Sequence, residues 1–453
     1  MKKFLFLASA LLVMATQVAN AQRVNTSKEV AKLDKADATL VDEKKNGKAA
    51  TWNAHGKAYT DAYMLPTKEL LRNSPVQTLQ MNVGQPDQMV EGMFMDAPVV
   101  VCSYEYVDVF VNPQTYMIVG WEQKKSIKEN LAETAIASYK KAYELDPKLG
   151  SKIAANAMTL ANALAIQGDA LSLCGKNIEA AYCFELAYLA QQVCPEAKAN
   201  PGNAYNAGYL YVLVASTLSG DEAVAMFTKA EAMLSEAVAA GYKDETGSAY
   251  YYLFHCYYGL KEQNSAEMLA KAKDVLLEGI KLYPKNSLIL DGLMHLYTAE
   301  EGVGDPAELV SMFEASLKND PTNYDLWFGR GRLFNAMKNY KECIVSFKKC
   351  AELRPNDYDA HYWTGYFIVE DVNLVIEEVN ATGTTDYELQ QKRLDEANLL
   401  FMDALPWFEK AHEINPTDIG AIDYLNKLCF RLRDVEGMME KYNKYHELYM
   451  QMQ

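Results

Sequence analysis

One spacing of small, aromatic and proline residues occurs in four segments of this chain, and it constrains the fold more than any other feature. Its fullest copy extends from Tyr324 to Pro355 and has a small or aromatic residue at most positions: Trp327, Gly331, Phe334, Cys343, Phe347, Cys350 and Pro355. Small residues allow two helix backbones to approach closely, and large rings fill the gaps between layers of helices. Proline ends the second helix because it has no amide hydrogen to donate. The spacing therefore predicts pairs of packed helices.

Partial copies of the same spacing occur along the rest of the chain. The second half recurs as Ala404, Phe408, Ala411 and Pro416, as Ala135, Tyr139, Ala142 and Pro147, and as Ala272, Leu276, Gly279 and Pro284. The first half recurs as Trp52, Gly56 and Tyr59. The pattern resembles the tetratricopeptide repeat, in which antiparallel helix pairs stack on one another. The step of 34 residues from Pro321 to Pro355 equals the period of that family.

This resemblance implies an all-α fold, a right-handed helical solenoid in which each repeat packs only on its neighbours. A chain of 453 residues is too long for one compact core, and an array of repeats avoids that limit. Arrays of this kind present binding surfaces, so the resemblance implies a scaffold that binds a protein or peptide ligand.

The N-terminus has the features of a secretory signal peptide at residues 1–21. Lys2 and Lys3 precede a short apolar run, and Ala19 and Ala21 form a cleavage site, so the mature chain is expected to begin at Gln22. An uncleaved anchor is the alternative. No cysteine follows the cleavage site, which excludes a lipoprotein. These features are similar to those of exported, Bacteroides-like bacterial proteins, and we expect a periplasmic or outer-membrane-associated protein without a membrane span.

Charge and cysteine content exclude several classes of partner and site. The chain has 44 basic and 60 acidic side chains, a net charge of −16, so we do not expect nucleic acid as a partner. Cys343 and Cys350 occupy positions that hold alanine in another copy, which indicates small core residues. Cys183 and Cys194 would lie ~16 Å apart along one helix and cannot form a disulfide. Pairing of the other cysteines and the oligomeric state are left open.

The signal peptide is followed by three parts of the chain. Residues 22–48 are expected to form a lead-in helix or linker, and residues 49–147 a first repeat whose partner helix lies near 130–145. An insert at about 65–128 separates these two helices. Residues 148–453 are expected to continue the array and to end in capping helices, where Lys441 and Lys444 replace apolar residues. The segment from Pro355 to Pro416 is almost two periods long, which predicts two lengthened helices joined by a loop at 380–383.

The insert has the composition of a small β-sheet. A β-branched and aromatic run at 99–111, a turn at 112–114 and a second run at 115–122 predict a hairpin. A lone hairpin is marginal in water, so 76–81 or 89–95 is expected to add further strands. Two roles are open for the insert: a cap on the end of the array, or a module that docks a partner.

Residues typical of catalysis are nearly absent. The chain has no phosphate-binding loop, zinc-protease motif or serine-hydrolase motif, and its six histidines are never paired at a spacing that binds metal. The acidic residues of the insert, Asp96, Glu105, Asp108 and Glu122, are candidates for an enzyme site, but no nucleophile or histidine accompanies them. We therefore expect neither enzyme activity nor a cofactor.

The remaining candidate site is the inner groove lined by the first helix of each repeat. In resembling repeats the groove-facing positions lie one and five residues after the large aromatic residue. In this chain those positions hold Asn53, Lys57, Tyr205, Tyr209, Phe328, Arg332, Tyr362 and Tyr366. Such side chains suit peptide recognition, although tyrosines packed between layers are the alternative. A second hypothesis is a glycan-binding component of an outer-membrane uptake system, with Trp121 and nearby tyrosines as the sugar platform.

Overall fold

The computed structural model describes residues 24–381 and 387–452, and it divides into two compact units. The first unit extends to Lys243 and includes His255–Glu262, and the second comprises Asp244–Phe254 and the chain from Gln263 onward. The predicted signal peptide at 1–21 lies outside the described residues, as do Thr382 and Gly383 of the predicted loop.

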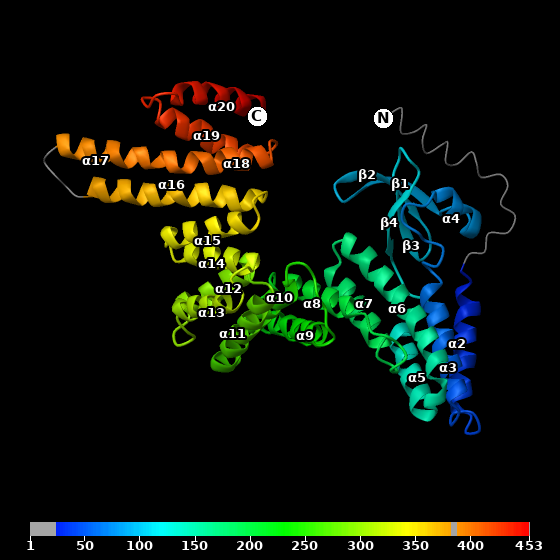
Figure 1. Ribbon diagram of the computed structural model, residues 1–453. Coiled ribbons are helices and arrows are strands. Elements are labelled where there is room, and N and C mark those ends of the chain that lie inside the picture. The colour runs from blue at the N-terminus through cyan, green and yellow to red at the C-terminus, as the bar shows by residue number, and fades with distance from the viewer. Residues whose placement is uncertain (1–23, 382–386, 453) are drawn as a thin grey trace. The chain divides into compact units, whose positions relative to one another are not determined.

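The first unit is built from helices that pack in consecutive pairs (Figure 1). α3 packs on α5, α6 packs on α7, and α8 packs on α9, while α2 lies against α3. The helices are α2 (Thr26–Val41), α3 (Ala49–Met64), α4 (Val76–Val83), α5 (Leu131–Leu145), α6 (Gly150–Leu173), α7 (Asn177–Ala190), α8 (Pro201–Ala215) and α9 (Gly220–Ala239), with a short 3-10 helix at Pro147–Leu149.

The second unit continues the same arrangement. Figure 1 shows α14 to α20 as successive layers, with α17 and α18 end to end in one layer. α14 packs on α15 and α15 on α16, α16 packs on both α17 and α18, and α18 packs on α19, which packs on α20. The helices are α11 (Ser265–Leu282), α12 (Ser287–Ala299), α13 (Pro306–Asn319), α14 (Tyr324–Ala336), α15 (Tyr340–Leu353), α16 (Tyr358–Ala381), α17 (Tyr387–Leu399), α18 (Leu405–Ile414), α19 (Ile419–Arg431) and α20 (Met438–Met452). α10 (Ser248–Gly259) contributes its N-terminal part to this unit. The predicted array of helix pairs is confirmed.

A glycine facing a large side chain recurs in the helix pairs. A Cβ atom on Gly331 of α14 would lie 2.5 Å from the ring of Phe347 on α15, so only glycine allows this approach. The same contact joins Gly56 to Tyr139, Gly168 to Phe184, Gly208 to Leu234 and Gly365 to Phe408. The close approach predicted at Gly331 is therefore a repeated feature of the fold.

Prolines end the second helices of several pairs. α11, α13, α15 and α18 each end two residues before a proline, at Pro284, Pro321, Pro355 and Pro416. The residue before a proline is driven away from helical geometry, and proline itself has no amide to continue the hydrogen-bond ladder. Side-chain caps begin the next helices: the Oδ1 atom of Asn323, for example, accepts a hydrogen bond from the amide of Leu326 at 3.1 Å.

The insert folds into a four-stranded antiparallel sheet of order β1-β2-β3-β4. Its strands are β1 (Gln88–Phe94), β2 (Ala97–Ser103), β3 (Val107–Val111) and β4 (Ile118–Gln123). The hairpin predicted at the 112–114 turn is confirmed, and the strand expected at 89–95 is β1. The strand expected at 76–81 is wrong, because Val76, Leu79 and Val83 follow a helical period and form one face of α4.

The continuous strand expected at 99–111 is also wrong, because the chain reverses within it. The amide of Tyr104 donates a hydrogen bond to the carbonyl oxygen of Val107 at 2.8 Å, which closes a tight turn between β2 and β3. One face of the sheet packs under α4 through a cluster that includes Val76, Cys102 and Val109. The opposite face packs Phe94, Val99 and Phe110 against Leu173 at the end of α6.

The lengthened repeat between Pro355 and Pro416 differs from its prediction in one helix. α16 is long, at 24 residues, as expected. The second helix is interrupted: α17 is followed by a 3-10 helix at Leu400–Ala404 and then by α18. Pro406 lies at the first turn of α18, where its missing amide costs no hydrogen bond, and this position favours a new helix start over a continuous helix.

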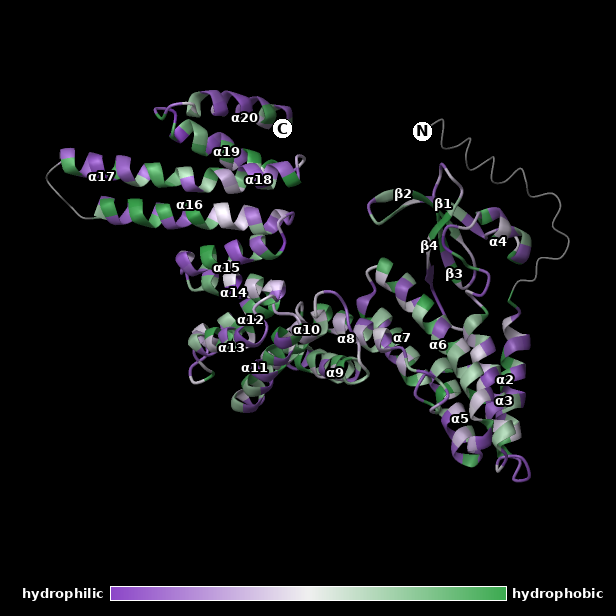
Figure 2. Cartoon of the chain, in the orientation of Figure 1, coloured by the Kyte–Doolittle hydropathy of each residue, from purple (hydrophilic) through white to green (hydrophobic). Residues whose placement is uncertain are grey.

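All eight cysteines are described and all are free thiols. Cys343 and Cys350 are fully buried beside Phe347, which confirms their prediction as small core residues. Figure 2 shows hydrophobic and hydrophilic residues mixed along the helices. Within residues 24–381 and 387–452, every helix is either too short or too polar to span a bilayer.

Candidate ligand-binding surface

First helices of the second unit carry a group of half-buried aromatic rings. Tyr362 and Tyr366 lie one turn apart on α16, and both meet Tyr424 of α19, with ring centroids 6.1 and 6.0 Å apart. Trp363 contacts both α16 tyrosines edge to face, at 5.4 Å in each case. We use the name aromatic surface for this group together with two residues of α14: Phe328, Arg332, Tyr362, Trp363, Tyr366 and Tyr424.

Fully buried phenylalanines of the second helices support these rings. Phe408 of α18 stacks on Tyr424 with centroids 4.7 Å apart and ring planes 2° apart, and it meets Tyr362 edge to face at 5.8 Å. Phe347 of α15 meets Phe328 edge to face at 5.1 Å. Each ring of the aromatic surface is therefore fixed on one side by the core and is partly exposed on the other. The same rings can therefore both pack between layers of helices and contact a ligand.

Arg332 supplies the positive charge of this surface. Its guanidinium lies 6.0 Å from the ring centroid of Trp363, a cation–π distance. Arg330, two residues earlier, is instead 7% exposed and structural. It donates to a carboxylate oxygen of Glu314 at 2.8 Å, to one of Glu342 at 2.6 Å and to the hydroxyl of Ser346 at 2.7 Å. The spacing pattern gave no signal for Arg330.

Tyrosine-to-aspartate hydrogen bonds link consecutive repeats beside the aromatic surface. The hydroxyl of Tyr324 donates to Asp357 at 2.9 Å, and that of Tyr358 donates to Asp418 at 2.5 Å. Burial, followed by the neighbouring carboxylate, raises the pKa of both phenols, so they remain neutral donors. Burial and then the charge of Asp357 raise the pKa of Asp359. Carboxylates therefore gather where these first helices begin.

Candidates in the first unit have different environments. Tyr205 and Tyr209 of α8 are partly exposed, and Tyr205 stacks on Tyr242 with centroids 4.2 Å apart. Lys57 is exposed and pairs with Asp61 on its own helix at 2.6 Å. Asn53 is only 4% exposed, and its Oδ1 atom accepts a hydrogen bond from Asn156 of α6, so it joins two helices and does not face a ligand. The second unit brings together Phe328, Arg332, Tyr362 and Tyr366.

Comparison with known families identifies one of these helix pairs. Residues 324–357, which comprise α14, α15 and the following turn, match the family model described as the tetratricopeptide repeat. This chain contains a tetratricopeptide repeat. Its bounds include both Gly331 and Phe347, and they end at Asp357, the acceptor for Tyr324. A search of curated proteins gave no match.

Solved structures similar to this chain include tetratricopeptide proteins. The C-terminal part of a tetratricopeptide protein from Cytophaga hutchinsonii is 14% identical, with a TM-score of 0.33, and the alignment covers 63% of this chain and 93% of that one. Yeast Tom70 is also 14% identical with a TM-score of 0.33, over 72% of this chain and 59% of Tom70. YrrB, titled a protein with an unusual peptide-binding site, is 20% identical with a TM-score of 0.22, over 49% and 95%.

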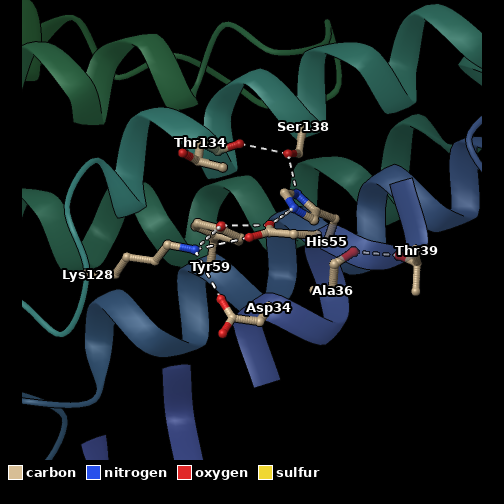
Figure 3. Close-up of polar contacts among 9 residues, drawn as sticks. Asp34, Ala36, Thr39, His55, Tyr59, Lys128, Thr134 and Ser138 are labelled. Carbon is tan, nitrogen blue, oxygen red and sulfur yellow. Dashed lines mark hydrogen bonds and ion pairs between the residues drawn. The ribbon is translucent and has the colours of Figure 1, made fainter. Parts of the chain in front are cut away.

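Outside the tetratricopeptide repeat, a polar network connects α2, α3 and α5 (Figure 3). A carboxylate oxygen of Asp37 lies 2.9 Å from Nε2 of His55, and Nδ1 of His55 lies 2.8 Å from the hydroxyl of Ser138. This order of carboxylate, imidazole and hydroxyl also occurs in acyl-transfer enzymes. Here Ser138 is only 1% exposed, and its hydroxyl also bonds to the carbonyl oxygen of Thr134 at 2.7 Å. The network therefore joins helices, and its hydroxyl has no access to a substrate.

Asp37 is the acceptor that holds this network together. It also accepts from the hydroxyl of Tyr59 at 2.7 Å and from Nζ of Lys128 at 3.0 Å. Burial raises the pKa of Asp37, but hydrogen bonds from His55, Tyr59 and Lys128 outweigh that effect and lower the pKa below its ordinary value. At a pH above the pKa that Asp37 has in the unfolded chain, the ionised carboxylate makes its full contribution to stability. This contribution is lost as the pH falls through the lower pKa of the folded state.

Replacement of Asp37 by asparagine is expected to lower the free energy of unfolding by about 1 kcal/mol at neutral pH. The estimate is modest because the Asp37 side chain is 41% exposed and solvent screens its charge. Urea titrations from about pH 7 to pH 3 compare the two proteins. The difference in free energy of unfolding between the two proteins should shrink as the solution becomes more acidic. A difference that does not change with pH would contradict the role of ionised Asp37 in this network.

Three of the four acidic residues singled out in the insert form ion pairs with lysines. Lys125 pairs with Glu105 at 2.9 Å, Lys124 pairs with Asp108 at 2.9 Å, and Lys176 pairs with Glu122 at 2.5 Å. Asp96 lies in the turn between β1 and β2, apart from these pairs. In the described parts of the chain, no three His, Cys, Asp or Glu side chains are grouped so that they could bind a metal ion.

A cavity of about 460 Å³ lies beside α4. Of the four acidic residues of the insert, Glu105 lines this cavity. Its wall combines apolar side chains with Lys68, Glu69 and Asp87.

Trp121, the proposed sugar platform, is 3% exposed, and its indole nitrogen donates to Gln167 at 3.4 Å. A sugar cannot stack on a ring buried in this way, so the glycan hypothesis loses its main residue.

Proposed function

We propose that this chain is a non-catalytic scaffold that binds a protein or peptide through the aromatic surface of α14, α16 and α19. The observation that carries the proposal is the arrangement of Tyr362, Tyr366 and Tyr424, which meet across two first helices and are held by buried phenylalanines. Rigid aromatic rings with polar tips provide contact area at a small entropic cost, and tyrosine and arginine are enriched among residues that dominate binding.

The charges around these rings favour a ligand with basic as well as apolar side chains. Burial raises the pKa of Tyr362, and the charges of Asp418 and Asp423 raise it further. Burial and then Glu370 have the same effect on Tyr366. Negative potential is therefore present at the tyrosines, whereas Arg332 places a positive charge beside Trp363. A peptide that combines aromatic or aliphatic residues with lysine or arginine near the tyrosines and a carboxylate near Arg332 would satisfy both features.

We place this function outside the cytoplasm, in a bacterial envelope, as a periplasmic or outer-membrane-associated protein. The support is the residue pattern at 1–21, where two lysines precede an apolar run and an alanine-rich cleavage site. Sequencing of the N-terminus of the protein purified from its native source tests this placement. A mature chain that begins at Gln22 supports export, and an intact Met1 in a cytoplasmic fraction contradicts it.

A random dodecapeptide library displayed on phage tests the binding proposal. Peptides selected on the full mature chain are then measured against an Arg332→Ala/Tyr366→Ala variant. We expect the dissociation constant to rise at least about tenfold, because each truncation removes a side chain of the type that dominates interfaces. Val345→Ala is the matched control, since Val345 lies on α15 and is 51% exposed outside the aromatic surface. Equal affinity in a folded double variant would contradict the proposal.

A further inference from the structure

The two edges of the β-sheet in the insert differ. The outer edge of β4 is occupied by residues 73–76. The amide of Asn73 donates to the carbonyl oxygen of Ile118 at 2.8 Å, and the amide of Ile118 donates to the carbonyl oxygen of Ser74 at 2.9 Å. The other edge strand, β1, pairs with β2 alone. Among the described residues, no backbone hydrogen bond is formed at its outer edge.

Hairpin geometry identifies the backbone groups that β1 presents outward. β1 and β2 are joined by a two-residue turn, Met95 and Asp96, whose φ angles of 50° and 59° are typical of a type I′ turn. The pair that closes such a turn, Phe94 with Ala97, is hydrogen-bonded, and hydrogen-bonded pairs alternate along an antiparallel ladder. The amides and carbonyls of Met89, Glu91 and Met93 therefore point away from β2.

The residue opposite Met93 supports this register. Met93 is paired with Pro98, which has no amide hydrogen, so this pair cannot be a reciprocally hydrogen-bonded one. Gly92 belongs to a hydrogen-bonded pair with Val99, and a Cβ atom on Gly92 would lie 2.8 Å from the side chain of Val101, on the face shared with Val90. The three outward residues thus form one continuous row of unpaired donors and acceptors.

Side chains along β1 leave this edge accessible. Val90 is 42% exposed, Met93 is 65% exposed and Met95 is 62% exposed. Edge strands are commonly protected from further pairing by lysine, proline or a bulge, and β1 contains none of these. Its one charged residue is Glu91, which is exposed and forms no ion pair with any residue that the structure describes. An unprotected edge of seven residues is long enough to pair with another strand.

We propose that β1 binds an extended segment of a partner protein, which adds a fifth strand to the sheet and carries lysine or arginine opposite Glu91. The backbone row of Met89, Glu91 and Met93 requires an extended main chain as the occupant. The exposed Glu91 and the net charge of −16 favour a basic one. This surface is separate from the aromatic surface and does not depend on it.

A second copy of this chain fits the edge less well than a basic segment does. Two β1 strands pair over their full length in antiparallel register only when residue 91 meets residue 91 of the other copy. The two Glu91 carboxylates would then lie directly opposite each other, and like charges in a cross-strand pair are destabilising. A dimer through β1 is an outcome that analytical ultracentrifugation of the full mature chain detects, and it would overturn the assignment of a basic partner.

Synthetic nonapeptides of alternating valine and threonine test the proposal with the full mature chain. One peptide has lysine at its centre and another has glutamate. Two further lysine peptides carry N-methyl groups on alternate amides. In the first peptide the methylated amides are those that would face β1, and in the second they are those that would face solvent. By fluorescence anisotropy, the lysine peptide should bind at least tenfold more tightly than the glutamate peptide, and methylation of the β1-facing amides alone should abolish binding.

Two variants complete the test. Glu91→Lys is expected to reverse the preference, so that the glutamate peptide binds more tightly. Met93→Pro removes one outward amide without removing a bond to β2, and it should weaken lysine-peptide binding at least tenfold, whereas Met93→Thr should not. The proposal is overturned if Glu91→Lys leaves the preference unchanged, or if Arg332→Ala/Tyr366→Ala abolishes binding of the lysine peptide, since that would place it on the aromatic surface.

Discussion

Replacement of Gly329 by alanine is expected to lower the free energy of unfolding of the second unit by about 3 kcal/mol. In an ordinary helix the same change would stabilise by up to about 1 kcal/mol, because alanine is the better helix former. Here the added Cβ would lie 1.9 Å from the carbonyl oxygen of Pro284 and 2.7 Å from the ring of Phe313. A backbone oxygen cannot rotate away as a side chain can, so α14 would have to move off the preceding repeat.

Urea unfolding followed by circular dichroism measures this effect. Gly47→Ala is the control, because no atom lies within 4 Å of a Cβ built on Gly47 and its φ is not positive, and its effect should stay within about 0.5 kcal/mol. A Gly329→Ala protein as stable as the wild type would show that α14 does not pack against the carbonyl of Pro284. The glycine at position 329 would then not be explained by close packing, whereas Gly331 would keep its contact with Phe347.

Truncation of Phe408 to alanine is expected to cost about 4 kcal/mol of unfolding free energy. Phe408 is fully buried, faces Gly365 of α16 and supports both Tyr362 and Tyr424. Its removal leaves a cavity that these rings cannot fill without leaving the aromatic surface. Affinity for a selected peptide should therefore fall as well, even at temperatures where the variant is folded.

Phe408→Leu is the matched control for the loss of volume. Leucine occupies the equivalent position in the Gly208–Leu234 contact, so a branched aliphatic side chain fits opposite glycine in this fold. We expect Phe408→Leu to cost about 1 kcal/mol, and both variants are compared by thermal unfolding and by peptide binding. If Phe408→Ala lost less than about 1 kcal/mol, Phe408 would not be the support that its position indicates.

The helix pairs were predictable because their signals are local and repeated. Small residues such as Gly331 and Gly365, large partners such as Phe347 and Phe408, and a following proline recur at fixed spacings, and each contact joins neighbouring helices. The partner of α3 could be found across a long insert because Tyr139 continues the pattern that Gly56 begins. The aromatic surface was partly predictable for the same reason, since Phe328, Arg332, Tyr362 and Tyr366 have fixed positions within the repeat.

Contacts between distant segments were not predictable. Lys128 reaches Asp37 from 91 residues away, and no spacing rule connects a loop lysine to a lead-in helix. Asn53 has the position of a groove residue, but it is buried and accepts a hydrogen bond from Asn156 of α6, a contact that no repeat position predicts. The reversal at 104–106 divides one β-branched run into β2 and β3, since composition predicts strand residues without indicating where the chain turns.

Hydrogen exchange of the full mature chain, with and without a peptide selected from the random library, tests the central claim most directly. The account predicts that amide protection rises in α14, α16 and α19 and that mass spectrometry recovers the peptide unchanged. Protection confined to other helices, or recovery of a cleaved or modified peptide, would contradict it.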